Sequence, residues 1–93
     1  MIVDIDIFVN DTLVKTYLRD GDDVTILPRV GEYIMLSSDE LELEDIEEAQ
    51  IENEFDDEGY IEVLVTKIVH DLDGDNVFIH TQTKHKRTKE VRR

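Results

Sequence analysis

The first eighteen residues carry the pattern that most restricts the fold of this chain. From Ile2 to Leu18, apolar and polar side chains alternate with a period of two, and the pair Asn10-Asp11 lies at the centre. Such alternation places every second side chain on the same face of a β-strand. Asn and Asp tolerate the positive φ angles of a two-residue hairpin turn. The segment therefore predicts a β-hairpin with one apolar face, which has to be buried by further elements.

A two-residue turn also fixes the register of this hairpin. On the inner face the predicted pairs are Val9–Thr12, Ile7–Val14, Ile5–Thr16 and Val3–Leu18. On the outer face they are Phe8–Leu13 and the ion pair Asp6–Lys15. One alignment thus gives both an apolar face and a charge-matched pair, which supports the register.

Three further strands are predicted. Pro28 and Gly31 indicate a bend that leads into a strand from Tyr33 to Leu36, with Ile34 and Leu36 pointing inward.

The longest β-like run covers residues 60–72, and Asp73-Gly74 predicts a turn into a last strand at 77–83. Apolar parity changes along the longest run, which predicts a bulge near Thr66-Lys67. The pairing of these two strands sets Val69 opposite Phe78 on the face away from the core.

Residues 39–58 are the most unusual segment, because they hold 12 acidic residues, no basic residue and five larger apolar side chains. Ser38 is a candidate helix cap, and Leu43 and Ile46 lie on one helical face, so a short helix is predicted within about 43–53. The apolar side chains are Leu41, Leu43, Ile46, Ile51 and Phe55. We expect them to cover the outer-face pairs Phe8–Leu13 and Val69–Phe78. The alternative cover is another protein chain.

The chain of 93 residues is short enough for one domain, predicted at 1–83 with the acidic insert at 39–58. The stretches LPRVGEYIML and YIEVLVTKIVHDLDGDNVFIHTQ resemble the cores of small SH3-like barrels in uncharacterised bacterial and phage proteins. The predicted fold is thus mainly β: a small SH3-like antiparallel β-barrel with a short acidic helix or loop insert. The resemblance implies a barrel and no specific activity. Residues 84–93, KHKRTKEVRR, are predicted to be a disordered basic tail.

Charge restricts the partners of such a domain. Residues 1–83 carry 23 acidic and 4 basic residues, within a net charge of −14 for the whole chain. This field repels phosphate backbones and anionic lipid and favours a basic protein partner, so we expect neither nucleic-acid nor membrane binding by the body of the domain. The tail is open to two interpretations: an arm that binds nucleic acid or a partner, or a counter-charge to the acidic insert.

The sequence lacks the residue patterns that would predict catalysis or cofactor binding. The chain has no cysteine, and neither Ser37 nor Ser38 has a histidine within sequence reach. The four glycines are isolated, so no phosphate-binding loop is predicted. No apolar run approaches the ~20 residues of a membrane helix. We expect a cytoplasmic protein that is not an enzyme and has no cofactor.

Two groups of residues resemble metal ligands, but the sequence predicts a metal site at neither. The run Asp71-Leu-Asp73-Gly-Asp75-Asn76 begins like a calcium loop but lacks glycine and glutamate at the sixth and twelfth positions, which favours a hairpin turn. With a turn of two or four residues, His70 and His80 lie on opposite faces. His70 is then expected at the end of the core and His80 in solvent.

The acidic insert is the predicted binding surface. Its candidate partner-binding residues are Glu40, Glu42, Glu44, Glu47, Glu48, Asp56 and Asp57. The first interpretation is an interaction module that presents this surface to a basic protein, in its narrower form a phage-type inhibitor that imitates nucleic acid. The alternative is a structural or assembly accessory domain whose charge serves solubility. The sequence leaves the oligomeric state open.

Overall fold

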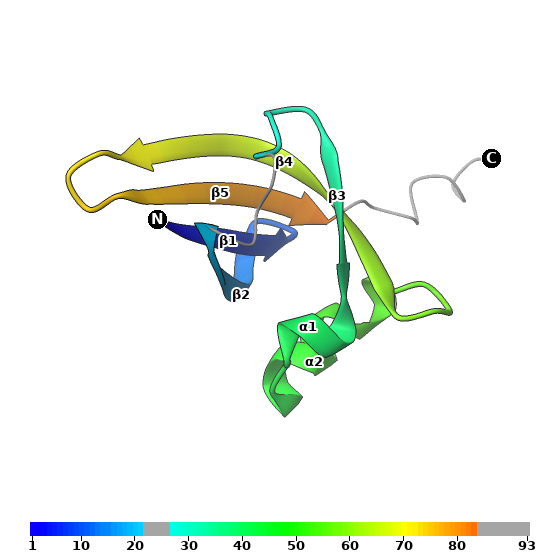
Figure 1. Cartoon of the computed structure of the whole chain (residues 1–93). Coiled ribbons are helices and arrows are strands. Elements are labelled where there is room, and N and C mark those ends of the chain that lie inside the picture. Colours follow the sequence, from blue (N-terminus) through cyan, green and yellow to red (C-terminus); the bar gives the residue numbers. More distant parts are fainter. Residues whose placement is uncertain (22–26, 84–93) are drawn as a thin grey trace.

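The computed structural model describes residues 1–21 and 27–83, which form one curled sheet of five strands with short helices at one end (Figure 1). The strands are β1 (Ile2–Val9), β2 (Thr12–Asp20), β3 (Tyr33–Ser37), β4 (Tyr60–Asp71) and β5 (Asn76–Thr83). Between β3 and β4 lie α1 (Ser38–Leu41), α2 (Asp45–Ile51) and the 3₁₀ helix η2 (Glu52–Glu54). The predicted mainly β fold with a short helical insert is confirmed. The basic tail at 84–93 lies outside the described residues.

The order of strands in the sheet is β2-β1-β5-β4-β3. Three neighbouring pairs are antiparallel, but β1 and β5 are parallel, so the expectation of antiparallel strands throughout is wrong at this pair. Two parallel neighbouring strands need a long connection between them. Here the chain from β2 to β4 forms the connection between β1 and β5. Because β2 and β3 are the edges of the sheet, the fold is a half-barrel.

The first hairpin forms at the predicted turn, where Asn10 and Asp11 have φ angles of 51° and 66°. The pairs nearest the turn, Val9–Thr12 and Phe8–Leu13, are those predicted. A bulge then shifts the register by one residue between Ile7 and Phe8. The four remaining predicted pairs, including the ion pair Asp6–Lys15, are therefore wrong; the pairs formed are Ile7–Lys15, Asp6–Thr16, Ile5–Tyr17, Asp4–Leu18 and Val3–Arg19.

The bulge has a clear structural consequence for β2. Val14 stays buried, but one extra residue reverses the parity of the rest of the strand. Tyr17 packs against the core in place of Leu18, which is 60% exposed. Lys15 and Arg19 are carried to the inner face, where both form ion pairs with the acidic insert.

We expect Asp11→Gly to stabilise the hairpin by about 0.5–1 kcal/mol, because glycine adopts the positive φ of this turn at no steric cost. Chemical denaturation would measure the gain. Asp11→Asn is the matched control, since it removes the same charge and keeps the side chain. An equal gain in both variants would show that charge, and not backbone conformation, is responsible.

The predicted features of β3 and β4 are confirmed. Leu36 is buried and Ile34 packs against the core, whereas Tyr33 and Met35 are exposed. The register of β4 against β5 shifts between Val65 and Lys67, at the expected bulge.

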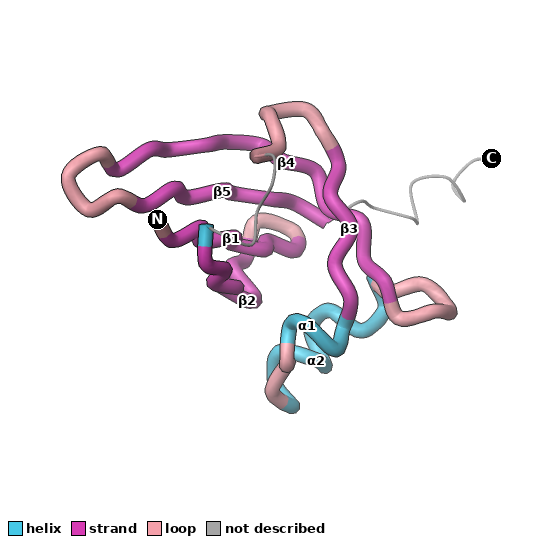
Figure 2. The backbone as a smooth tube through the Cα atoms, viewed as in Figure 1, coloured by secondary structure: helices cyan, strands magenta, loops and turns pink. Residues whose placement is uncertain are grey.

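One core lines the inner face of the half-barrel. Its members are Val3, Ile5, Ile7, Val9, Val14, Leu36, Leu41, Ile51, Ile61, Val63, Val65, Val77 and Ile79. Leu41 and Ile51 come from the helical insert, which lies at the end of the β3–β4 hairpin (Figure 2). Leu43 and Phe55 pack against this core, but Ile46 is 77% exposed, so the predicted helical face containing Ile46 is wrong. The insert ends one helix at Leu41 and begins another at Asp45, and this break changes which side chains face inward.

Candidate partner-binding surface

The acidic insert is anchored to the domain by two buried side chains. Leu41 of α1 is 1% exposed and Ile51 of α2 is 0% exposed. Burying two such side chains contributes roughly 3–6 kcal/mol before the cost of ordering the segment. The insert is therefore held in a fixed position on the half-barrel.

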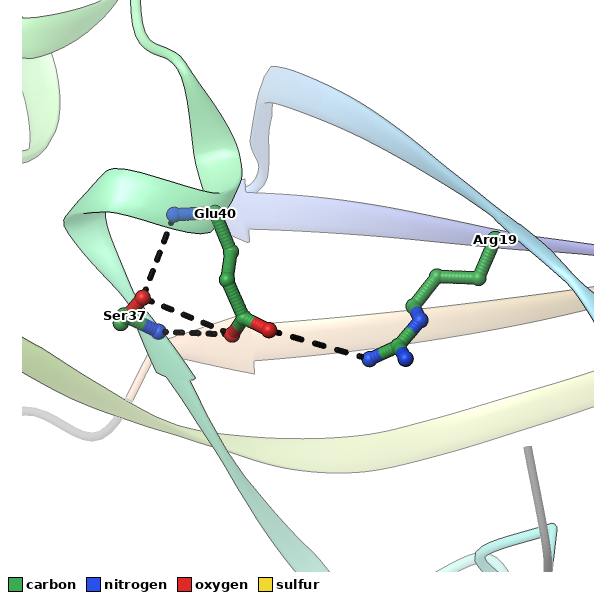
Figure 3. A network of polar contacts seen from close by, with 3 residues as sticks. All are labelled: Arg19, Ser37 and Glu40. Atoms are coloured by element: carbon green, nitrogen blue, oxygen red, sulfur yellow. Dashed lines mark hydrogen bonds and ion pairs between the residues drawn. The ribbon is translucent and has the colours of Figure 1, made fainter. Parts of the chain in front are cut away.

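Glu40 is part of the structure that fixes α1. The hydroxyl of Ser37 accepts a hydrogen bond from the Glu40 N–H at 3.2 Å, and the Glu40 carboxylate accepts one from the Ser37 N–H at 3.5 Å. The cap is thus Ser37, and the prediction of Ser38 is wrong by one residue. The Glu40 carboxylate also lies 3.9 Å from the guanidinium of Arg19 on β2 (Figure 3).

Glu47 connects α2 to the same strand. Its Oε1 atom accepts a hydrogen bond from the Glu44 N–H at 3.0 Å and one from the Lys15 ammonium at 3.2 Å. The Glu44 N–H, and after it Lys15, lower the pKa of Glu47, so this carboxyl stays ionised. Together with Arg19–Glu40, this pair ties the edge strand β2 to both helices.

Asp56 shapes the entry into β4. Its Oδ1 atom accepts hydrogen bonds from the N–H groups of Glu58 and Tyr60, both at 2.9 Å. Gly59 has a φ of 86°, which suits the tight turn before the strand.

The seven predicted binding residues therefore divide into two groups. Glu40, Glu47 and Asp56 hold the insert in place through ion pairs and hydrogen bonds within the domain. The other four are exposed: Glu42, Glu44, Glu48 and Asp57. The local signals for the first group were present in the sequence as a capping box at 37–40 and an Asp-x-x-Gly turn at 56–59.

A second charged cluster, on the outer face of the sheet, was missed by sequence reasoning. Asp6 accepts a hydrogen bond from the Thr16 hydroxyl at 2.8 Å, and its Oδ2 lies 3.8 Å from His80 Nε2. The His80 ring stacks on Phe8, with 5.7 Å between centroids and an interplanar angle of 14°. The sequence indicates this cluster only through Asp4 and Asp6, which alternate with isoleucine residues in β1.

Asp4, two residues earlier on the same face, completes this cluster. Its Oδ1 atom is buried and has no hydrogen-bond partner among the described residues. Burial, and after it the hydrogen bond and charge of Asp6, raise the pKa of Asp4 to about 6. Asp4 thus interacts with Asp6, but its Oδ1 atom has no hydrogen-bond donor among the described residues.

The structure places the histidines and acidic residues that were weighed as metal ligands. His70 pairs with Val77 and His80 with Lys67, which places the two histidines on opposite faces as predicted. His70 is exposed, however, so its expected position in the core is wrong. Asp71 Oδ1 accepts a hydrogen bond from the Gly74 N–H at 3.1 Å, within a hairpin turn. Within 1–21 and 27–83, no cluster of three or more His, Asp or Glu side chains has the arrangement of a metal site.

Comparisons of the chain with models of protein families, with curated proteins and with solved structures gave no match. In the part of the chain that the structure describes, no helix has the length and apolar character needed to cross a membrane.

Proposed function

We propose that this protein is a non-enzymatic, cytoplasmic interaction module that presents an acidic surface to a basic protein partner. The observation that carries the proposal is the anchoring of the insert: Leu41 and Ile51 are buried, while Glu42, Glu44 and Glu48 between them are exposed. A surface already fixed before binding loses less conformational entropy when a partner docks. A net charge of −14 also accelerates encounter with a positively charged partner.

The narrower form of this proposal is a phage-type inhibitor that imitates nucleic acid, on a fold related to SH3-like barrels. Glu44 and Glu48 lie about one helical turn apart, roughly 6 Å, which approaches the spacing of phosphates along a strand. The helix is short, so the imitation would extend over a few phosphates only.

The alternative is a structural or assembly accessory domain whose charge serves solubility. One observation favours it: Glu40, Glu47 and Asp56 are already used within the fold. A stable homo-oligomer that forms without a basic partner would support this alternative. Binding that weakens steadily with added salt would support the interaction module.

The test uses two variants with the same net charge. The insert variant carries Glu42→Gln, Glu44→Gln and Glu48→Gln, and the control carries Asp11→Asn, Asp73→Asn and Asp75→Asn at exposed turns. Proteins retained from a lysate of the source cells at ~0.15 M salt are identified, and the affinity of the retained protein is measured for each variant.

We expect the insert variant to bind about tenfold more weakly than wild type, at a few tenths to 1 kcal/mol for each exposed charge. The control should bind almost as wild type does. If both variants lost the same affinity, the interaction would be nonspecific attraction between charges. If the insert variant kept the affinity of wild type, the insert would not be part of the binding surface.

A further inference from the structure

The outer face of the sheet, which points away from the core, has an ordered pattern of side chains. Paired residues on neighbouring strands form three rows that run across it. The first apolar row is Leu18, Asp4, Phe78 and Val69. The polar row is Thr16, Asp6, His80 and Lys67. The second apolar row is Leu13, Phe8, Gln82, Leu64 and Tyr33.

Much of this face is apolar and open to solvent. Leu13 is 50% and Tyr33 51% exposed, in addition to Leu18. A hollow of about 300 Å³ lies beside the first apolar row, lined by Met1, Ile2, Leu18, Arg19 and Asp20. A solvent-exposed face of a β-sheet usually carries polar side chains. The apolar composition of this face is therefore that of a contact surface.

The helical insert does not cover it. The pairs Phe8–Leu13 and Val69–Phe78 form as predicted, but Leu41 and Ile51 are buried in the core on the inner face. The expectation that the insert covers the outer pairs is therefore wrong. Within the described residues the insert is therefore excluded, and of the two covers expected from the sequence another protein chain remains.

Charge identifies the chemistry of that chain. Asp4 and Asp6 lie in adjacent rows at the middle of the face, and the buried Oδ1 of Asp4 has no donor among the described residues. A second copy of this protein would bring two such carboxylate pairs together, each on a chain of net charge −14. A basic side chain would instead supply the opposite charge to this pair of carboxylates.

The spacing of the rows identifies the form of the segment. Neighbouring rows are two residues apart along β1 and β5, about 6.6 Å, and alternate side chains of an extended peptide have the same spacing. If a bound peptide places one apolar side chain on each apolar row, the alternate side chain between those two lies on the polar row. Arginine suits that position because its planar guanidinium donates to two carboxylates at once.

We propose that the outer face binds an extended segment of a basic protein in which an arginine is flanked at alternate positions by apolar side chains. This inference rests on the proposed function in one respect, the basic nature of the partner, and places a second contact surface opposite the acidic insert.

The probe is a synthetic peptide with blocked ends and the order Ser-Val-Thr-Arg-Thr-Val-Ser, titrated into the full chain at ~0.15 M salt and pH 7. Amide shifts in the NMR spectrum report both affinity and the strands touched. Two control peptides replace the arginine by glutamine or both valines by serine. We expect the shifts to map to β1, β2 and β5, and each control peptide to bind at least about tenfold more weakly.

Protein variants separate this surface from nonspecific attraction. The double variant Asp4→Asn, Asp6→Asn should weaken the peptide about tenfold or more, as should Leu18→Ser with Val69→Ser. The insert variant Glu42→Gln, Glu44→Gln, Glu48→Gln and the control Asp11→Asn, Asp73→Asn, Asp75→Asn should bind the peptide nearly as wild type does.

Three outcomes would overturn the inference: equal loss in all charge variants, shifts that map to the insert, or no difference between the arginine and glutamine peptides. A folded state is verified for each variant from the dispersion of its amide spectrum. Because the insert variant tests the proposed function with a different partner, either proposal can fail while the other stands.

Discussion

Ile51→Ser is expected to lower the free energy of unfolding by about 3–5 kcal/mol, through the loss of a fully buried side chain and the introduction of a hydroxyl into the core. Ile51 is 0% exposed and belongs to the core cluster of the half-barrel. A domain of this size has only about 5–10 kcal/mol in total, so the variant should be largely or partly unfolded at physiological temperature. Urea denaturation followed by circular dichroism would measure the change.

Ile46→Ser is the matched control, because Ile46 lies on the same helix and is exposed. Its free energy of unfolding should stay within about 0.5 kcal/mol of wild type. Ile51→Val, which removes one methylene, should cost about 1 kcal/mol. If Ile51→Ser and Ile46→Ser behaved alike, the insert would not be anchored, and the fixed acidic surface of the proposed function would lose its basis.

The second large effect is a dependence of stability on pH that comes from Asp4. Its pKa in the folded protein is about 6, above the ordinary value of 3.8. Between these two values the folded state binds more protons than the unfolded state, so the contribution of Asp4 to stability is present below about pH 4 and is lost as the pH rises through 6. Asp4→Asn removes the ionised form and should stabilise the protein at pH 7. Because Asp4 is only partly buried, solvent screening reduces the expected gain to about 1 kcal/mol.

The stabilising effect of Asp4→Asn should shrink as the pH falls from 7 to 4. The charged or polar groups on the same face of β1 and its neighbouring strands are Asp6 on β1, Thr16 and Asp20 on β2, and Asn76 and His80 on β5. These groups are unchanged in the variant, so the difference between variant and wild type at each pH reports Asp4 together with its interaction with Asp6. Thermal midpoints across this range provide the measurement, with exposed Asp73→Asn as control. A difference that is the same at pH 4 and pH 7 would contradict a raised pKa.

Those features of the fold that local chemistry controls were predictable from the sequence. The Asn10-Asp11 turn follows from two residues that accept positive φ. The bulge near Thr66-Lys67 follows from the change of apolar parity within one strand, and with it the Val69–Phe78 pair. The location of the acidic insert between two strands also required only the run of acids at 39–58.

The register of β2 and the buried side of the insert were decided by tertiary structure. The residues from Val14 to Leu18 give an acceptable hairpin with or without the bulge. The bulged register is the one that brings Tyr17 against the core and carries Lys15 and Arg19 to the carboxylates of Glu47 and Glu40. Those carboxylates belong to another part of the chain, so no local pattern in β2 could reveal them. For the same reason, Ile51 and Ile46 could not be separated by helical periodicity alone.

The amino-acid sequence by itself determined the class of this protein: a mainly β chain with an acidic insert and a strongly negative charge, because alternation and composition act locally. Only the tertiary structure decided that β1 and β5 are parallel neighbours, a pairing in which the buried Thr81 hydroxyl donates to the Asp6 carbonyl at 2.9 Å. That pairing assembles Asp4, Asp6 and His80 on the outer face. Residues from opposite ends of the described chain meet there because β1 and β5 pair and contribute side chains to one core.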